Sequence, residues 1–316
     1  MSRDRKLSAL QPQTPASAKA VASILAAGCL WGTVGVFVRY LNGLGYSPLT
    51  IVFVRMSIAF VILTVVLLAA GRRDLFRIKL KDLWCFVGTG VSSAIMLNLF
   101  FSMSTVMNPL SLAAILLATA PIFVVLISAI IFRERITAVK LQALIIAFAG
   151  AILTGGILGS AAAFSGKGFA VGLLAGFGYA LYSIFTRFAL NRGYDALTVN
   201  LYSFFIGSVV CAPFTSFSTV FGSIAAAPLL TAVVLLLHTL FTSLLPYVLY
   251  TYGMQYTDTG KASILVSVEP VAATVFGVVL YGEVPSAAAF AGIALVLFAI
   301  ALLNLPNGMR TFLPKK

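Results

Sequence analysis

Charged residues, histidine and cysteine are scarce in this chain of 316 residues. Only 9% of its residues are charged and 61% are hydrophobic, a composition that excludes an ordinary soluble globular domain. One histidine and three scattered cysteines cannot build an ordinary zinc site, so no metal is predicted. The cysteines Cys29, Cys85 and Cys211 are odd in number and lie in apolar runs, so no disulfide framework is implied.

Sequence motifs for nucleotide hydrolysis and for hydrolytic catalysis are also missing. The chain contains no GxxxxGK[ST] phosphate-binding loop, no GxSxG nucleophile elbow and no HExxH zinc motif. We therefore predict that the protein is not an enzyme, needs no cofactor and has no ATP-hydrolysing motor of its own. Energy for its work would come from an ion gradient, from the gradient of its solute or from the membrane potential.

Long apolar runs dominate what is present. Each is long enough to cross a bilayer as a helix, so we predict an all-α membrane protein with ten transmembrane helices. The predicted spans are 19–40, 48–70, 82–105, 109–132, 137–158, 168–190, 197–221, 229–256, 260–281 and 286–304. Residues 1–18 and 305–316 are polar and are predicted to form tails.

The positive charges predict the orientation of the spans. Nearly all of the 21 Lys and Arg residues fall on the side that holds both termini, whereas Arg39 and Lys167 fall on the other side. Because positively charged loops stay in the cytoplasm, both termini are predicted to be cytoplasmic in an inner (plasma) membrane. The net charge of +13 thus indicates topology and not a nucleic-acid partner. We expect a small-molecule substrate and the lipid bilayer as partners. Whether the protein forms a homodimer is left open.

The two halves of the chain align with each other after a shift of 148 or 149 residues. Five spans per half is an odd number, so the halves would enter the membrane in opposite directions, as in alternating-access carriers. We assign one five-helix repeat to residues 19–158 and the other to 168–304. The matches that apolar composition does not explain are Gly45-Tyr46 with Gly193-Tyr194, Pro121 with Pro270, and Glu134 with Glu283.

The strongest functional signal is Glu269, which is followed by Pro270 in the ninth predicted span. At a rise of 1.5 Å per residue, Glu269 would lie roughly 14 Å into a hydrocarbon core about 30 Å thick. A carboxylate there costs on the order of 2.5–3.5 kcal/mol, so we expect it to face a cavity or a partner. Pro270 removes a backbone donor and breaks the helix beside the acid. A structurally paired glutamate is the alternative interpretation.

Aromatic and polar positions that match between the halves are the other candidates for a substrate site. Rings beside a single carboxylate suit an organic cation, which the negative face of each ring attracts. The alternative is that the tryptophans and tyrosines mark the membrane interface. The candidate substrate-binding residues besides Glu269 are Trp31, Tyr247, Tyr250, Asn98, Tyr179 and Tyr182.

His238 and Arg55 are candidates for proton relay or gating. Imidazole titrates near neutral pH, so His238 suits a relay, and the alternative is a neutral histidine bonded to Thr239 or Thr242. Arg55 lies eight residues past Ser47, and we expect it to extend outward or to pair with a helix end.

Two further groups of residues predict helix packing. Glu134, at the end of the fourth span, is expected to cap or bridge a neighbouring helix. The glycine pairs Gly28/Gly32 and Gly172/Gly176 have the spacing that lets helices approach closely.

Several segments resemble the drug/metabolite transporter superfamily and, within it, the EamA family of ten-span carriers. These are WGTVGVFVR at 31–39, VRMSIA at 54–59, and the pair APIFVVLISAIIFRE and EPVAATVFGVVLYGE. GYALYSIFTRFAL at 178–190, together with KASILVSVEPVAATVFGVVLYGE at 261–283, is similar to a branch that includes bacterial choline importers. The resemblance implies a carrier of a small organic solute, with an organic cation such as choline or a related amine preferred.

Two other functions stay open at this point. Other EamA members are similar to exporters of amino acids and drugs, which would make Glu269 a proton-coupling carboxylate. A non-transporting membrane receptor or lipid-handling scaffold is the alternative of a different class, although inverted halves offer a receptor no clear advantage.

Overall fold

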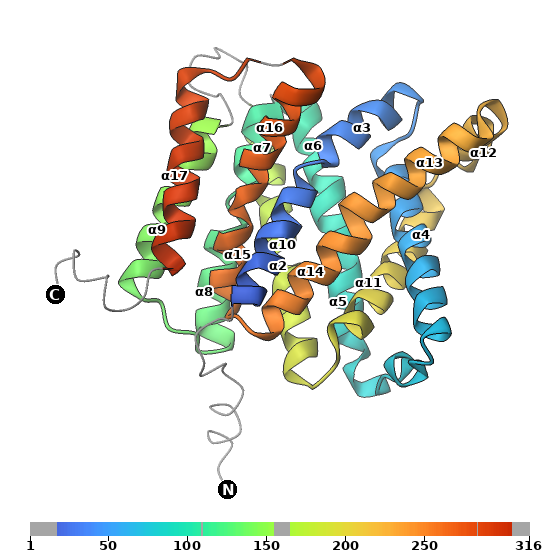
Figure 1. Ribbon diagram of the computed structural model, residues 1–316, viewed down its shortest axis with the longest axis horizontal. Helices are drawn as coiled ribbons and strands as arrows, with labels where there is room; N and C mark the ends of the chain where they lie inside the picture. Colours follow the sequence, from blue (N-terminus) through green and yellow to red (C-terminus); the bar gives the residue numbers. More distant parts are fainter. Residues whose placement is uncertain (1–17, 109, 155–164, 283, 305–316) are drawn as a thin grey trace, which may run out of the picture.

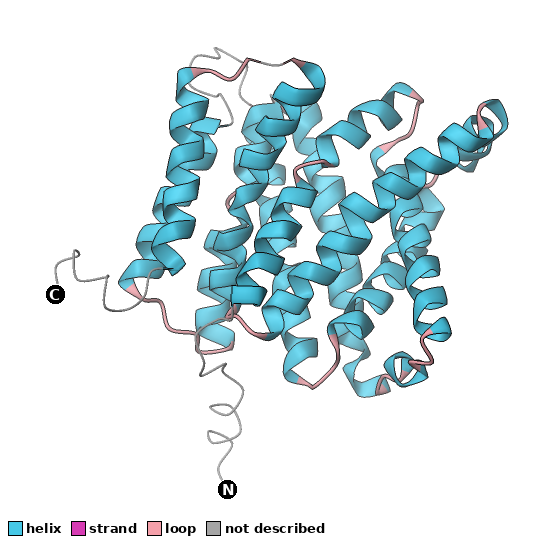
Figure 2. Cartoon of the chain, viewed as in Figure 1, coloured by secondary structure: helices cyan, strands magenta, loops and turns pink. Residues whose placement is uncertain are grey.

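The computed structural model describes residues 18–108, 110–154, 165–282 and 284–304. Its described residues are helical with short connections and contain no strand, which confirms the all-α prediction (Figure 2). The helices of the first half are α2 (Ala18–Trp31), α3 (Val34–Gly43), α4 (Pro48–Ala69), α5 (Leu83–Val91), α6 (Asn98–Met107), α7 (Leu110–Leu117), α8 (Ala120–Ile131) and α9 (Ala138–Thr154). Those of the second half are α10 (Gly166–Asn191), α11 (Ala196–Cys211), α12 (Phe217–Ala226), α13 (Pro228–Thr239), α14 (Leu245–Gln255), α15 (Thr259–Leu265), α16 (Glu269–Tyr281) and α17 (Ala287–Asn304).

Nine helical stretches in the described part of the chain are long and apolar enough to cross a membrane. They are Ala18–Gly43, Pro48–Ala69, Leu80–Met107, Leu112–Ile131, Gly166–Asn191, Ala196–Phe214, Pro228–Gln255, Thr259–Tyr281 and Ala287–Asn304. The shorter apolar helix α9 corresponds to the predicted span 137–158, whose last residues lie outside the described ones. Together they match the ten predicted spans in order.

The predicted span 197–221 is wrong at its far end. Helix α11 stops at Cys211, and a separate helix, α12, begins at Phe217. Pro213 has no backbone N–H with which to continue the helical hydrogen bonds. The backbone N–H of Ser216 instead donates to the Thr50 Oγ1 of α4, at 3.0 Å. The turn between the two helices is therefore tied to the first half of the chain.

Equivalent helices of the two halves run in opposite directions (Figure 1). Helix α2 starts at the lower end of the view and runs upward, whereas α10 starts at the upper end and runs downward. The last helices behave in the same way, because α9 runs upward beside the descending α17, and these two pack closely. Helix α2 begins and α17 ends toward the lower end, as an even number of spans requires.

Interruptions of the helices also recur at equivalent positions. A π-helical segment, η3 (Ser92–Leu97), has its counterpart in η5 (Leu240–Leu244), which starts 148 residues later (92 to 240). The break between α7 and α8 matches a short 3₁₀ segment, η6 (Val266–Val268), between α15 and α16. The helices that follow these breaks begin 149 residues apart (120 to 269).

In the second half, the proline break lies against glycines of α2 and of the turn that follows it. Pro270 has no N–H to give to the carbonyl of Val266, four residues back. A Cβ on Gly28 would lie 3.0 Å from that carbonyl oxygen, and a Cβ on Gly32 would lie 2.8 Å from the backbone nitrogen of Ala273. The absence of side chains at Gly28 and Gly32 is what lets α2 approach η6 and α16 so closely.

The first half repeats this arrangement. Pro121 cannot donate to the carbonyl of Leu117, and a Cβ on Gly176 of α10 would lie 3.4 Å from that oxygen and 2.8 Å from the carbonyl oxygen of Leu116. Gly172, one turn earlier in α10, packs against the Leu116 side chain. Both predicted glycine pairs are thus contacts between the halves, each at a proline break.

At the lower end of the molecule, Glu134 joins the halves as expected of a helix cap. Its carboxylate accepts hydrogen bonds from the backbone N–H groups of Thr259 (2.8 Å) and Gly260 (3.1 Å), at the start of α15. Lys140 of α9 adds an ion pair to Asp258, with Nζ 2.9 Å from Oδ1, and lies 3.9 Å from Glu134 Oε2. A carboxylate at a helix N-terminus also compensates the helix dipole.

We predict that Gly32→Ala destabilises the protein, because the new methyl group would press on the backbone of α16. Overpacking of this kind costs about 1–3 kcal/mol. The matched control is Gly35→Ala in α3, where a Cβ meets nothing within 4 Å. Thermal unfolding of the purified protein in detergent should show a lower Tm for the first variant and an unchanged or higher Tm for the second. Equal Tm values would contradict the close contact of the helices.

Candidate functional site

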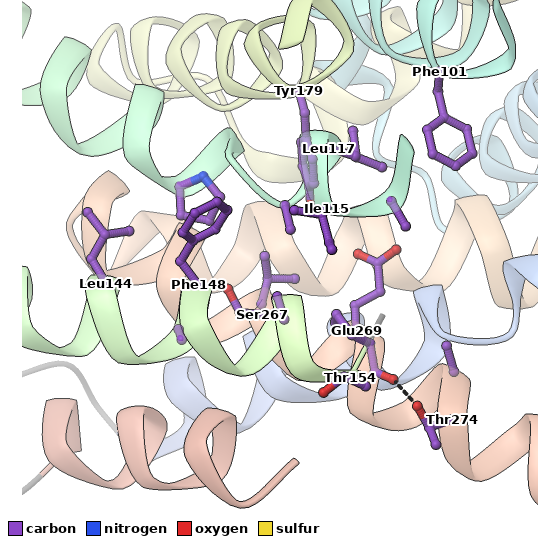
Figure 3. A pocket seen from close by; sticks show the side chains of 18 residues that line it. Phe101, Ile115, Leu117, Leu144, Phe148, Thr154, Tyr179, Ser267, Glu269 and Thr274 are labelled. Atoms are coloured by element: carbon purple, nitrogen blue, oxygen red, sulfur yellow. Dashed lines mark hydrogen bonds between the residues drawn. The ribbon is translucent and has the colours of Figure 1, made fainter. Parts of the chain in front are cut away.

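A cavity of about 610 Å³ lies where the two proline breaks approach each other (Figure 3). This volume falls in the usual range for small-molecule sites. Its walls come from α6, α7, α8 and α9 of the first half, and from α10, η6 and α16 of the second half. The lining residues are mainly apolar: Phe101, Ala114, Ile115, Leu117, Ala118, Pro121, Leu144, Ala147, Phe148, Ala151, Thr154, Tyr179, Val266, Ser267, Glu269, Pro270, Ala273 and Thr274.

Glu269 is the first residue of α16, and its carboxylate points into the cavity (Figure 3). Among the described residues, the Glu269 carboxylate has no ion-pair partner and no side-chain hydrogen bond. Of the two expected environments, a cavity or a partner, the structure therefore shows the cavity. Pro270 orients this acid by ending the regular hydrogen bonding of the helix just before it.

Tyr179 of α10 lines the same cavity. Its hydroxyl is buried and has no hydrogen-bond partner among the described residues. A buried polar atom without a partner loses the stabilisation that water would give it, so a ligand that bonds to it would restore that stabilisation. The ring of Tyr179 also stands edge-on to that of Trp31, with centroids 6.2 Å apart, and this contact connects the cavity to a larger group of rings.

We call that group the aromatic cluster; it consists of Trp31, Tyr179, Tyr182, Tyr247 and Tyr250. The ring of Trp31 lies 5.3 Å from that of Tyr247 and 5.5 Å from that of Tyr250, and Tyr182 lies 5.2 Å from Tyr247. Trp31, Tyr182, Tyr247 and Tyr250 are all buried. Their burial inside the protein argues against the alternative that these rings mark the membrane interface. Tyr179 reaches the cavity, and the other four rings pack behind it.

Two tyrosine hydroxyls of the aromatic cluster are satisfied within the protein. Tyr250 shares a hydrogen bond of 2.9 Å with Ser183 Oγ, and Tyr182 lies 3.4 Å from Thr251 Oγ1. These bonds hold α10 and α14 together and fix the orientation of both rings. The hydroxyl of Tyr179, in contrast, has no hydrogen-bond partner among the described residues.

Asn98 and Arg55 form a pair away from the cavity lining. Arg55 Nη2 donates to Asn98 Oδ1 at 3.1 Å, and Asn98 Nδ2 donates to the carbonyl of Ser93. Arg55 is only 5% exposed, so the expectation that its side chain extends outward is wrong. The π-helical turn η3 precedes Asn98 directly and sets its position on α6, where its amide offers Arg55 an internal acceptor.

His238 of α13 is completely buried and lies outside the cavity lining. Its Nδ1 is 3.2 Å from Thr242 Oγ1, and the same hydroxyl donates to its carbonyl oxygen at 2.8 Å. The ring of Phe37 packs against it, with centroids 5.4 Å apart. Bonding to a threonine is the structural alternative that the sequence left open. The Nε2 atom has no partner among the described residues.

Helix α9 contributes residues to the cavity wall that were not predicted from the sequence. Leu144, Ala147, Phe148 and Ala151 all line the cavity. Their spacing of three and four residues places them on one face of the helix. That pattern was present in the sequence, but in a helix apolar on every side it does not tell a cavity face from a lipid face. Phe101, one turn after Asn98, also lines the cavity and is not among the residues predicted from the sequence.

Comparison with known proteins adds the family. The model of the EamA-like transporter family matches residues 18–156 and, a second time, residues 166–305. The chain belongs to the EamA-like transporter family. The EamA resemblance found in the sequence is therefore confirmed, and the double match agrees with the two halves described above. Its finer likeness to choline importers stays a prediction.

Relatives of this EamA protein are also named as transporters. An uncharacterized transporter of Archaeoglobus fulgidus is 26% identical over 85% of this chain and 93% of its own length. A probable terminal-alkyne amino-acid exporter of Streptantibioticus cattleyicolor is 27% identical over 90% of this chain and 93% of its own. A solved structure with 18% identity aligns with a TM-score of 0.73 over 90% of this chain and 96% of its own, which supports the fold. The EamA protein is accordingly a multi-pass membrane transporter.

We predict that Tyr179→Phe leaves the Tm unchanged or raises it, because the buried hydroxyl it removes has no hydrogen-bond partner among the described residues. The matched variant Tyr250→Phe removes the bond to Ser183 and should cost about 1 kcal/mol. Thermal unfolding of both variants beside the unsubstituted protein measures the difference. A loss of stability in Tyr179→Phe that equals the loss in Tyr250→Phe would show that the Tyr179 hydroxyl has an internal partner.

Proposed function

We propose that this EamA protein is a secondary carrier that moves a small ammonium-bearing organic solute across the membrane by alternating access. The observation that carries the proposal is the Glu269 carboxylate, which has no ion-pair partner among the described residues and lines a mainly apolar cavity of about 610 Å³. A negative charge held away from water gains most from a cation that enters the same space. The family and the names of its relatives support transport as the activity.

Ring faces beside the acid favour an organic cation over a hydrated metal ion. Tyr179 and Phe101 line the cavity together with Glu269. Each well-placed ring contributes about 0.5–2 kcal/mol to binding of an ammonium group. The apolar side chains of α9 would cover the hydrocarbon part of the solute. Choline or a related amine fits this chemistry, and the sequence resemblance to choline importers points the same way.

The second candidate is export of an amino acid or drug coupled to protons. The relative from Streptantibioticus cattleyicolor named as a probable amino-acid exporter supports it. In that mechanism Glu269 would release its proton when the solute binds and take one up after the solute leaves. Sensitivity to the pH gradient then separates the two candidates, because a permanent cation such as choline needs no proton to balance it.

Contacts between the halves at the lower end support alternating access. Glu134 and Lys140 belong to the first half, and their partners Asp258, Thr259 and Gly260 belong to the second half. Opening the cavity toward this end requires these bonds to break. At the two proline breaks, glycines place no side chain between α2 and α16, or between α10 and the α7–α8 break. These are the surfaces along which the two halves would slide.

The proposed location is the inner membrane, with the lower end of Figure 1 in the cytoplasm. Positive side chains follow the helices that end there. They include Arg72, Arg73, Arg77, Lys79, Lys81, Arg133, Arg135 and Arg192. Loops with such an excess stay on the cytoplasmic side, which supports cytoplasmic termini.

We predict that Glu269→Gln abolishes uptake of radiolabelled choline into vesicles that contain the purified protein. The amide keeps the shape of the side chain but removes the charge that binds the cation. Asp74→Asn is the control, because it neutralises an exposed acid in a loop and should leave uptake unchanged. A potassium diffusion potential should drive uptake, since 100 mV is worth about 2.3 kcal/mol per positive charge.

Other outcomes of this experiment would change the assignment. Uptake by the Glu269→Gln variant at the original rate would remove Glu269 from the mechanism. Transport that follows an imposed pH gradient and ignores the potential would favour the proton-coupled exporter. Stabilisation by choline without any flux would favour a receptor.

A further inference from the structure

Arg55 is a second charged group in the membrane-spanning part of the protein, and the proposed carrier mechanism does not use it. Its side chain is buried in α4. It makes one hydrogen bond, to the neutral amide of Asn98, and its Nε has no partner among the described residues. The described residues give it no ion pair either. A buried guanidinium in this environment lacks the compensation that a counter-ion normally provides.

The acidic residues that the structure describes are used elsewhere. Asp74 pairs with Arg72, Asp82 pairs with Arg192, and Asp258 pairs with Lys140. Glu134 and Asp195 accept hydrogen bonds from the backbone at the starts of α15 and α11, and Glu269 faces the cavity. The positive charge of Arg55 is therefore available to an anionic group from outside the described part of the chain.

Other polar atoms without partners lie on elements around Arg55. His238 belongs to α13, which packs against α4, and its imidazole Nε2 has no hydrogen-bond partner among the described residues. The Ser243 hydroxyl is also buried without a partner, and it belongs to η5, which packs against α4. Unsatisfied buried polar atoms are uncommon in folded proteins, so their presence near a lone guanidinium suggests a polar ligand.

Two connections link Arg55 to the cavity of Glu269. Along α6, Asn98 lies one turn before Phe101, which lines that cavity. The second connection runs through η5, which packs against α4 and continues directly into α14, the helix of Tyr247. The ring of Tyr247 packs on Trp31, and Trp31 packs on Tyr179, which lines the cavity. A solute with two opposite charges could match both groups.

We propose that Arg55, held by Asn98, is the subsite for a carboxylate of the transported solute, whose ammonium group binds Glu269. The solute that matches both groups is then a zwitterion, such as an amino acid or a betaine, whereas choline would occupy only the Glu269 part of the site. This inference rests on the proposed binding of ammonium by Glu269. A guanidinium with free N–H groups matches a carboxylate in shape and charge. Arg55 does not line the cavity in this conformation, so binding requires side chains between the two groups, Tyr247 or Phe101, to move.

The test compares ligands that differ only by a carboxylate. Betaine and choline share a trimethylammonium group, and L-leucine and 3-methylbutylamine share an amine and a hydrocarbon chain. Binding to the full-length purified protein is measured by the rise in Tm as each ligand is titrated. The unsubstituted protein should bind the carboxylate-bearing member of at least one pair more tightly. Arg55→Met should weaken that member about tenfold or more and should change its partner little, because a charge-assisted hydrogen bond is lost.

Two further variants keep the test decisive if Arg55→Met does not fold. Asn98→Asp leaves Arg55 in place but gives it an internal carboxylate, so the preference for betaine or leucine should disappear. Arg72→Met is the matched control, because it removes an arginine from an exposed loop and should change neither ligand.

The remaining outcomes separate this inference from the proposed function. Equal binding within both pairs, or retention of the preference in Asn98→Asp, would overturn the carboxylate subsite. Binding of choline and the amine alone, lost in Glu269→Gln, would also overturn the subsite but would preserve the proposed function. Failure of the unsubstituted protein to bind any of the four ligands would overturn both.

Discussion

The lone carboxylate at Glu269 is the constraint on which the arrangement of this carrier depends. Glu269 opens α16 beside Pro270 and faces a cavity without an internal counter-ion among the described residues. Placing a carboxylate inside a membrane is energetically unfavourable, and the protein reduces this cost by placing Glu269 in a cavity where the two halves meet. The irregular backbone around it is covered by α2, which can come close because Gly28 and Gly32 have no side chains. Glu269, the helix break at Pro270 and the two glycines therefore depend on one another structurally.

The repeat explains why this unit exists twice in outline and once in chemistry. Gly176 against the backbone before Pro121 reproduces the packing of Gly28 against the backbone before Pro270. The position equivalent to Glu269 is Ala120, which has no charge. The two breaks thus match in backbone and packing, and the acid at position 269 distinguishes the second from the first. In the proposed alternating-access cycle, a symmetric scaffold would let the halves move alike while the solute meets the same acid from either side.

Hydropathy and the internal repeat were enough to predict the ten spans and the opposed halves, because each depends on local composition or on a constant offset. Contacts between distant residues were not predictable in the same way. The bond from Arg55 to Asn98 depends on a π-helical turn that no residue pattern announces. The turn between α11 and α12 is bonded to Thr50, far away in the chain. The α9 wall was hidden because Ala and Leu serve lipid and cavity faces equally well.

One difference between the halves has a consequence for kinetics. Helices α2 and α3 are separated by a break at Gly32 and Thr33, whereas the equivalent stretch of α10 continues without interruption from Gly166 to Asn191. The first half therefore has an interrupted helix where the second half has a continuous one. In the proposed alternating-access cycle, this difference would give the two gates unequal opening free energies, so the empty carrier would favour one of its two open conformations. Uptake and efflux, each measured into a solute-free compartment, would then saturate at different rates.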